Sequence, residues 1–345
     1  MNVAFLPVYP NPYQRLLRDG LAQSGVSVEF LDGLPSSDWL RRSKSRVDLL
    51  HLHWLSGLYM NRYLTPVRMA LFVARLRQAR TLGYHIVWTA HNIMPHHAPF
   101  RPLHLAIRRL IMATADAVIV HCDHGRQELL ARFPRTRPTE VVPLGTYAGV
   151  YPVTMTREEA RKALGIAPHR FVYLALGNIA AYKGLEAFAA AFSKSAAPDD
   201  VAIIAGRNRD AALVARLERA TARDPRIRLH ADFIPDDAMQ KFLLAADVLV
   251  APFERVLTSS SVMVGLSYGL PVIVPDLGCL PELVTDGAGL VYRSGIDDGL
   301  ARALAEIRVA DRQAMSAASL RVAGELRWEA IGRQTAAIYE ACLRS

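Results

Sequence analysis

FVYLALGNIAAYKGLEAF, residues 171–188, reads as a strand, a glycine-flanked loop and the start of a helix. The β-branched and aromatic run 171–176 is typical of a buried strand. Glycines at both ends of the loop 177–184 let the backbone approach a phosphate, and Lys183 adds a positive charge at the helix N-terminus. The spacing fits neither a P-loop nor a dinucleotide fingerprint. We therefore predict a diphosphate-binding loop, with a tight turn and a solvated lysine as the structural alternative.

Eleven further strand-like runs alternate with helix-length segments on both sides of this stretch. Such alternation is typical of βαβ units and parallel sheets. Two sets of six strands predict an α/β fold with two doubly wound, Rossmann-like domains rather than one eight-stranded barrel. The twelve expected strands are 3–6, 26–31, 49–53, 85–89, 117–120, 140–142, 171–176, 201–205, 227–229, 248–251, 271–274 and 289–291.

A segment rich in Gly, Pro and Tyr, 143–156, separates the two sets and lacks hydrophobic periodicity, so we expect the hinge there. The predicted domains are 1–150 and 151–326. Residues 327–345 have apolar side chains at helical spacing, and we expect this helix to cross back to the N-terminal domain.

The net charge of +9 lies entirely in the first domain. Residues 1–150 hold 18 Lys and Arg against 9 Asp and Glu, whereas the remainder holds 23 of each. This asymmetry indicates an anionic partner such as a membrane surface, a polyphosphate, an acidic sugar or a nucleic acid, unless it only reflects a high-arginine proteome.

The segment 100–112 predicts where a lipid surface would be met. One helical face holds apolar side chains and the other holds cations, which is typical of an interfacial helix, although an ordinary amphipathic core helix has the same pattern. The apolar residues are Leu103, Ile107, Leu110 and Ile111, and the cations are Arg101, His104 and Arg108, joined by Arg68, Arg75, Arg77 and Arg80 from the preceding segment.

The start MNVAFLPVYP has no cationic leader before its apolar run. Arg or Pro interrupts the longest apolar segments well before the length of a bilayer span. We therefore expect a cytoplasmic protein that is peripheral at the inner face of the plasma membrane.

Ligands bind at the carboxyl ends of strands in open parallel sheets. In the second domain this rule selects the loop 177–184, Arg207 and the hydroxyl run 258–261. Hydroxyls at a helix start are ordinary caps, but four small polar residues there also make a second anion site. Two anion sites fit the two phosphates of a nucleotide-sugar. The expected donor-binding residues are Gly177, Asn178, Tyr182, Lys183, Gly184, Arg207, Phe233, Thr258, Ser259, Ser260, Ser261 and Glu282.

In the first domain the same rule selects polar and aromatic side chains that would face the acceptor across a cleft between the domains. We expect His51 and His53 on different faces of the strand, and no carboxylate or cysteine set completes a metal geometry, so we expect no metal. The expected acceptor-side residues are Asn11, Tyr13, His53, Trp54, Asn92, His96 and His97.

Together these motifs resemble GT-B glycosyltransferases, with a layout close to glycosyltransferase family 4. The loop 177–184 resembles that family's G-R-L-x-x-x-K-G donor loop, 269–272 its G-x-P-V entry and 280–284 its P-E-V-V segment. Two features differ. Asn178 replaces the loop arginine, and the E-x7-E pair of retaining members falls on Val256 and Val264, with Glu254 out of register.

A narrower resemblance, to the β-mannosyltransferases of xanthan-type exopolysaccharide assembly, extends over the whole chain. It implies an inverting transfer of mannose from GDP-mannose onto a polyprenyl-diphosphate-linked oligosaccharide at the inner membrane face. His97 stands where that pattern tends to have glutamate, and Leu55 where it has proline. The motifs that carry it are Asn11-Pro12-Tyr13, the run 51–54, His91-Asn92 with Pro95-His96, 182–184 and 258–261.

Inversion requires a base on the acceptor side. His91 and Asp123 are favoured because both follow strands that should end at the ligand edge; Asp32, His96 and His97 are further candidates. Lys183, with helix N-terminal amides and Arg207, would stabilise the leaving diphosphate, and the lack of a D-x-D motif suits metal-independent chemistry.

Four alternatives remain at this point. The first is a retaining family-4-like enzyme that uses a UDP-sugar, and it is disfavoured because this sequence lacks the E-x7-E carboxylate pair. A sugar-nucleotide epimerase would need catalytic acids for which Asp276 and Glu282 are poor candidates. A non-catalytic nucleotide-sugar-binding protein would share the same motifs. Nucleic-acid binding is disfavoured because no recognition-helix or aromatic-interleaved motif is present.

Overall fold

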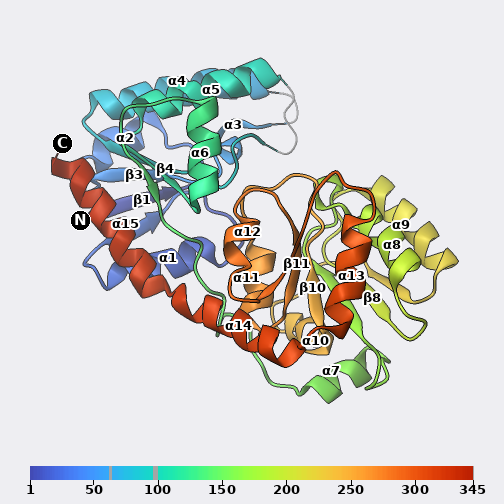
Figure 1. Cartoon of the computed structure of the whole chain (residues 1–345). Coiled ribbons are helices and arrows are strands. Elements are labelled where there is room, and N and C mark those ends of the chain that lie inside the picture. Colours follow the sequence, from blue (N-terminus) through green and yellow to red (C-terminus); the bar gives the residue numbers. More distant parts are fainter. Residues whose placement is uncertain (62–63, 96–99, 345) are drawn as a thin grey trace. The chain divides into compact units, whose positions relative to one another are not determined.

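The computed structural model describes residues 1–61, 64–95 and 100–344 (Figure 1). His96 and His97 lie outside the described residues. The chain divides into two compact units, the first comprising Met1–Gly145 with Leu326–Ser345 and the second Thr146–Glu325. Their border falls inside the segment 143–156.

The first unit is built on a parallel sheet with strand order β2-β1-β3-β4-β5-β6. Its strands are β1 (Asn2–Leu6), β2 (Ser27–Phe30), β3 (Leu49–Leu52), β4 (His85–Thr89), β5 (Ala117–Val120) and β6 (Thr139–Val141). Its helices are α1 (Tyr13–Ala22), α2 (Ser37–Ser43), α3 (Ser56–Tyr59), α4 (Thr65–Thr81), α5 (Arg101–Thr114), α6 (Asp123–Arg132) and α15 (Trp328–Arg344). The order of the strands reverses between β1 and β3, which is where a doubly wound sheet opens a crevice for ligands.

The second unit has the strand order β12-β11-β10-β7-β8-β9, again parallel, with the reversal between β7 and β10. Its strands are β7 (Val172–Leu176), β8 (Val201–Ala205), β9 (Ile227–His230), β10 (Val248–Val250), β11 (Val272–Pro275) and β12 (Gly289–Tyr292). Its helices are α7 (Arg157–Ala163), the short η1 (Ala181–Lys183), α8 (Leu185–Ser195), α9 (Ala211–Arg223), α10 (Met239–Ala245), α11 (Ser260–Ser267), α12 (Leu280–Leu283), α13 (Gly299–Val309) and α14 (Arg312–Glu325). All twelve predicted strands are present with ends within one residue, so the predicted pair of doubly wound sheets is confirmed.

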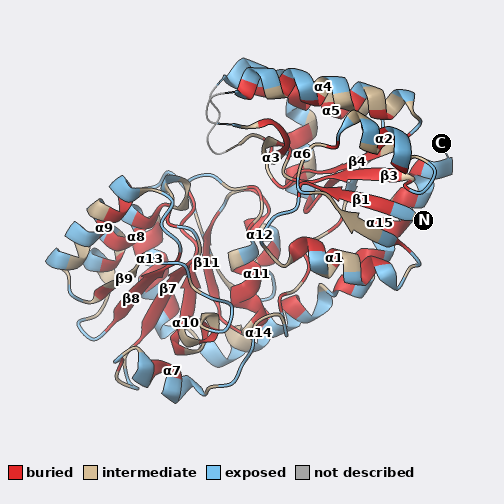
Figure 2. Cartoon of the chain, turned by 180° about the vertical axis from the view of Figure 1, so that it is seen from behind, coloured by how far each residue is buried: buried red, intermediate tan, exposed pale blue. Residues whose placement is uncertain are grey.

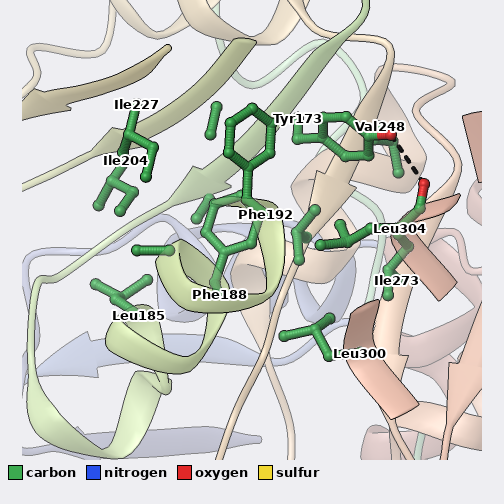
Figure 3. Packing of buried hydrophobic residues seen from close by; sticks show 14 of the residues in the cluster. Tyr173, Leu185, Phe188, Phe192, Ile204, Ile227, Val248, Ile273, Leu300 and Leu304 are labelled. Carbon is green, nitrogen blue, oxygen red and sulfur yellow. Dashed lines mark hydrogen bonds between the residues drawn. The ribbon is translucent and has the colours of Figure 1, made fainter. Parts of the chain in front are cut away.

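Helices cover both faces of each sheet, so the inner strands are apolar and almost wholly buried, whereas the edge strands β2, β6, β9 and β12 are mostly half-buried (Figure 2). In the second unit Tyr173, Phe188 and Phe192 form an aromatic centre between the sheet and its helices (Figure 3). The Tyr173 hydroxyl donates to the Leu304 carbonyl at 2.8 Å, so its one polar atom is satisfied inside the core.

The C-terminal helix α15 packs on α1 through two glycines. A Cβ atom at Gly20 would lie 2.1 Å from the Trp328 carbonyl oxygen, and one at Gly332 would lie 2.3 Å from the Gly20 carbonyl carbon. The helices thus approach more closely than side chains allow. Trp328 at the start of α15 also lies against Gly145, whose Cβ would meet its ring at 2.4 Å.

The predicted lipid-facing surface of α5 is wrong in part. His104 is fully buried and Arg108 is 3% exposed, so these two residues do not belong to a polar outer face. Arg108 points inward because Nε donates to the Ile93 carbonyl at 2.9 Å and its guanidinium lies 5.4 Å from the Trp88 ring centre. The outer surface of this region instead exposes apolar side chains, namely Leu64, Val67, Leu71, Phe100 and Leu103.

None of the helices in the described part of the chain has both the length and the apolar character that crossing a membrane requires.

Candidate functional site

Three backbone segments meet at the carboxyl end of β7. Gly184 has φ of 65°, and a Cβ there would lie 1.9 Å from the Pro252 carbonyl oxygen in the loop after β10. Gly206 has φ of 149°, and its Cβ would lie 1.8 Å from the Gly177 carbonyl oxygen. Glycine is therefore required at both positions, by conformation and by space. The loops after β7, β8 and β10 are joined into one layer at this edge of the second sheet.

Lys183 lies in this layer beside the start of α11. Its Nζ donates to Ser261 Oγ at 3.1 Å and lies 4.4 Å from the centre of the Phe253 ring. Ser259 Oγ is 3.0 Å from Ser261 Oγ and accepts from the Val262 amide, so Ser259 is the N-cap of α11. A cation, two hydroxyls and a helix N-terminus converge, which is the chemistry of a phosphate site.

Burial lowers the pKa of Lys183 to about 8. No carboxylate accounts for this ammonium in the contacts seen for it among the described residues. Thr258 Oγ1 is buried and has no hydrogen-bond partner within the described parts of the chain. An anion beside Lys183 would compensate its charge.

The other predicted donor residues surround this centre at the same edge of the sheet. Tyr182 stacks on Phe253, with ring centres 6.3 Å apart, and its carbonyl accepts from the Glu254 amide. Arg207 is exposed at the end of β8, where its carbonyl accepts from the Ile179 amide at 2.9 Å. Asn178, Ser260, Phe233 after β9 and Glu282 on α12 are also exposed.

In the first unit, histidines from three strand ends form a hydrogen-bonded chain. His53 Nδ1 lies 3.3 Å from His91 Nε2, and His91 Nδ1 lies 3.3 Å from His121 Nε2. His121 Nδ1 lies 2.9 Å from the carbonyl oxygen of Val142. All three rings are buried, so the sequence prediction that polar groups gather after β3, β4 and β5 describes a real cluster, but one that is largely covered.

The Val142 carbonyl fixes the protons of this chain. Because a carbonyl only accepts, His121 Nδ1 donates, and its Nε2 then accepts from His91 Nδ1. His91 Nε2 in turn accepts from His53 Nδ1. His53 Nε2 is left as an acceptor, and it is buried without a hydrogen-bond partner in the described structure.

Burial keeps these histidines neutral. It lowers the pKa of His121 to about 4, and it holds the pKa values of His53 and His91 well below the usual 6.5, assisted by the neighbouring imidazoles. His91 is thus unprotonated at neutral pH, as a base must be, but both of its ring nitrogens are bonded to other histidines.

Aromatic rings enclose the chain. Trp54 stacks on His91, with ring centres 4.2 Å apart and planes at 12°. Tyr13 meets the His91 ring edge-on at 4.8 Å and the Trp328 ring at 5.4 Å. Asn11 accepts from the Tyr13 amide at 3.1 Å, and Asn92 is half-buried after β4.

Asp123, the other predicted base, is exposed as the first residue of α6 and pairs with Arg126. It stands at the carboxyl end of β5, two residues beyond His121. Of the two favoured candidates, only Asp123 has its functional group at the surface of the first unit; Asp32, a further candidate, is also exposed, after β2.

The expectation that His51 and His53 point to opposite faces of the strand is wrong, because residues two apart share a face and the two ring centres lie 4.2 Å apart. His51 Nδ1 is hydrogen-bonded to the Tyr339 hydroxyl at 2.5 Å and His51 Nε2 to Thr89 Oγ1 at 2.7 Å. Tyr339 belongs to α15, 288 residues away in sequence, so no local pattern points to this contact.

The cluster does not have the geometry of a metal centre. His91 directs its two nitrogens at two different rings, so the imidazoles do not converge on one point. Over residues 1–61, 64–95 and 100–344, no three His, Cys, Asp or Glu side chains form a set that could hold a metal ion.

The fold is that of the GT-B glycosyltransferases. Sucrose-phosphate synthase from Thermosynechococcus elongatus superposes with a TM-score of 0.77 at 19% identity, covering 99% of this chain and 98% of that one. HepE from Anabaena, solved in complex with UDP-glucose, superposes with a TM-score of 0.75 at 16% identity, covering 99% of this chain and all of that one.

Residues 170–308 match the family model described as "Glycosyl transferases group 1". The second unit therefore carries a group 1 glycosyltransferase domain, and the chain is a glycosyltransferase. A GDP-mannose:glycolipid 4-beta-D-mannosyltransferase from Xanthomonas campestris is 24% identical over 316 residues, 88% of this chain and 81% of the relative. LpsB, a lipopolysaccharide core biosynthesis mannosyltransferase from Rhizobium meliloti, is 27% identical over 258 residues, 70% of each chain. The resemblance inferred from the motifs is thereby confirmed.

Because of the buried histidines, the free energy of unfolding depends on pH. With folded-state pKa values of about 3 for His51 and about 4 for His121, the unfolded chain, at 6.5, binds protons that the folded chain does not. Stability therefore falls as the pH drops below about 6.5, by about 2 kcal/mol for each of these histidines at about pH 5. Urea unfolding across this range measures the loss.

His121→Gln is expected to flatten this pH dependence, whereas His169→Gln, at an exposed position of the second unit, is the matched control and leaves it unchanged. A wild-type stability that stays constant between about pH 6.5 and pH 5 would contradict the assignment of neutral, buried imidazoles.

Proposed function

We propose that the protein transfers mannose from GDP-mannose, with inversion, onto a lipid-linked glycan acceptor in the assembly of a bacterial polysaccharide. The observation that carries the donor half of this proposal is the convergence of Lys183, two serine hydroxyls and the N-terminus of α11. The choice of mannose and of a lipid-linked acceptor is supported by the two mannosyltransferase relatives, one of which is described as acting on a glycolipid.

In this proposal the donor diphosphate binds against Lys183 and the amides at the start of α11. Arg207 and Phe233 flank the nucleoside at the ends of β8 and β9, and Glu282 contacts the sugar or the ribose. The leaving diphosphate gains negative charge as the sugar–oxygen bond breaks, and a fixed ammonium with helix N-terminal amides stabilises that charge without a metal ion.

The acceptor hydroxyl attacks the anomeric carbon while the bond to the diphosphate breaks, and its proton passes to a base. We assign the base to Asp123, because its carboxylate is exposed at the end of β5 whereas both nitrogens of His91 are occupied. Tyr13, Trp54 and the neutral histidine chain then form an aromatic support for the acceptor sugar.

A single displacement also agrees with the residues of the second unit. Val264, at the second position of the retaining pair, lies on α11 and is 4% exposed. A transfer with retention would need a group other than a carboxylate at that position.

The proposed lipid-linked acceptor requires the enzyme to work at a membrane surface. The exposed apolar residues of α4 and of the start of α5, Leu64, Val67, Leu71, Phe100 and Leu103, form the face that we assign to this contact. Arg77 and Arg101 are exposed on the same two helices and would meet anionic headgroups.

Nucleotide binding tests the proposed donor and its site at Lys183. GDP or GDP-mannose at about one hundred times its dissociation constant should stabilise the protein by about 2.7 kcal/mol, visible as a melting shift. Lys183→Ala should weaken binding by about 1.5–3 kcal/mol, because a charge-assisted hydrogen bond is lost, whereas Lys194→Ala on α8 should not. A shift with UDP-sugars alone would retain the glycosyltransferase and reject mannose.

Product analysis tests the reaction. Proton NMR of a mannosylated acceptor should show the β anomer, and an α anomer would reject inversion. Asp123→Asn should reduce kcat by about 100-fold or more while GDP binding stays unchanged. Glu128→Gln, at an exposed position on the same helix, is the control; an equal loss in both variants would remove Asp123 from the reaction.

Vesicle co-sedimentation tests the membrane face. Val67→Glu with Leu71→Glu should release the protein from vesicles that contain anionic lipid, because two exposed apolar contacts are replaced by charges that anionic lipid repels. Val309→Glu, at an exposed position on α13, is the control. Retention of the double variant on the vesicles would place the contact elsewhere.

A further inference from the structure

A second cationic site lies at the opposite end of the second sheet from the donor loop. Around the amino ends of β7, β10 and β11, helices α7, α10 and α14 lie next to one another (Figure 1). They border a cavity of about 720 Å³. Five arginines line it, and we call it the arginine cavity: Arg157, Arg161, Arg170, Arg308 and Arg312.

One carboxylate organises the cavity. The Asp247 side chain is 2% exposed, and Oδ1 accepts from Arg157 Nη2 at 2.6 Å and from Arg312. Its Oδ2 accepts from Arg161 Nη2 at 2.7 Å and from the Val172 amide. Three guanidinium groups thus share a single negative charge.

Two of these arginines are held in the fold by backbone carbonyls as well as by Asp247. Arg157 also donates to the carbonyls of Leu244 and Ala246, and Arg161 donates to those of Ala245 and Pro168. These carbonyls include the last ones of α10, which no residue of that helix can satisfy. Arg157 and Arg161 are therefore explained by structure alone.

The other three arginines keep unused donors. Arg312 contacts Asp247 through Nη1 alone, and Arg308 contacts Asp200 through Nε alone. Arg170 makes no side-chain hydrogen bond with the part of the chain that the structure describes, and it is half-buried. All three residues line the cavity.

The local charge is not balanced. Five arginines are accompanied by Asp247, by Asp200 against Arg308, and by Asp311, whose carboxylate accepts from the Gln313 and Ala314 amides at the start of α14. Asp199 also acts on Arg308, so the five arginines outnumber these carboxylates by one, 5 minus 4. Burial lowers the pKa of Arg161, and Arg157 and Arg312 add to that effect against the opposing Asp247, which is the expected consequence of crowded like charges.

We propose that the arginine cavity binds a phosphate-bearing molecule, of the class of phosphate monoesters and diphosphates, independently of the donor site. Planar guanidinium groups match phosphate oxygens in geometry and charge, and unused N–H groups from Arg170, Arg308 and Arg312 surround one space. The volume exceeds that of a single phosphate and leaves room for its organic substituent.

Inorganic pyrophosphate is the probe, and calorimetry on the full chain is the measurement. Lys183→Ala removes the ammonium of the donor site, so binding that survives in this variant reports the arginine cavity. Adding Arg170→Gln and Arg312→Gln should then weaken pyrophosphate binding by about tenfold or more. Asp247 keeps Arg157 and Arg161 in these variants, so its charge stays compensated.

The matched control adds Arg302→Gln and Arg321→Gln to Lys183→Ala, which removes the same charge from exposed positions on α13 and α14. It should bind pyrophosphate as Lys183→Ala does. Equal weakening in both triple variants would reduce the effect to general electrostatics and overturn the proposal, as would the absence of any binding in Lys183→Ala. Unchanged GDP binding by Arg170→Gln/Arg312→Gln with Lys183 intact shows that the fold is preserved.

Two further arms distinguish the source of the phosphate. If the natural ligand is a lipid, vesicles containing phosphatidic acid should bind Lys183→Ala, and the added Arg170 and Arg312 changes should abolish that binding. If it is soluble, mannose 6-phosphate should compete with pyrophosphate while the vesicles do not. Either result supports an anion site. If Lys183→Ala binds neither the vesicles, nor mannose 6-phosphate, nor pyrophosphate, the proposal is rejected.

Discussion

The contact between backbones at the carboxyl end of β7 is the constraint on which the donor region depends. Gly206 lies against the Gly177 carbonyl and Gly184 against the Pro252 carbonyl, at separations that leave no space for a Cβ atom. The loops after β7, β8 and β10 therefore have one shared path. Lys183 is placed over the start of α11 because the residue after it must turn at a left-handed φ. A side chain at Gly184 or Gly206 would displace the ammonium as well as the loop.

The two units present different groups at the carboxyl ends of their parallel strands. The second gathers a cation, hydroxyls and a helix N-terminus, which suits a diphosphate. The first gathers aromatic rings and histidines that burial keeps neutral, so it offers stacking and weak polarity in place of charge. The positive charge of the first unit is found elsewhere. Arg108, for example, lies on Trp88, and Arg80 pairs with Asp116.

The strands and the donor loop could be predicted because their causes are local. An apolar run of five residues, a glycine at a turn and a hydroxyl before a helix all have their reasons within a few positions of sequence. The contact of His51 with Tyr339 has no such local reason, nor does the arginine cavity, whose residues extend from Arg157 to Arg312. The wrong prediction of an exposed Arg108 on α5 has the same origin. Periodicity shows that Arg108 lies off the apolar face of the helix, but it does not show that the guanidinium contacts Trp88 and the Ile93 carbonyl.

The position of Val264 bears on the stereochemical outcome of the proposed transfer. A glutamate at this buried position of α11 would carry a charge into the core unless a ligand or a cation met it. In this chain the cation that approaches the start of α11, Lys183, is instead met by Ser261. Its positive charge remains uncompensated by protein among the contacts described for it, and is available to a diphosphate. In the proposed single displacement this uncompensated ammonium stabilises the leaving diphosphate, and Val264 supplies no carboxylate for a retaining transfer.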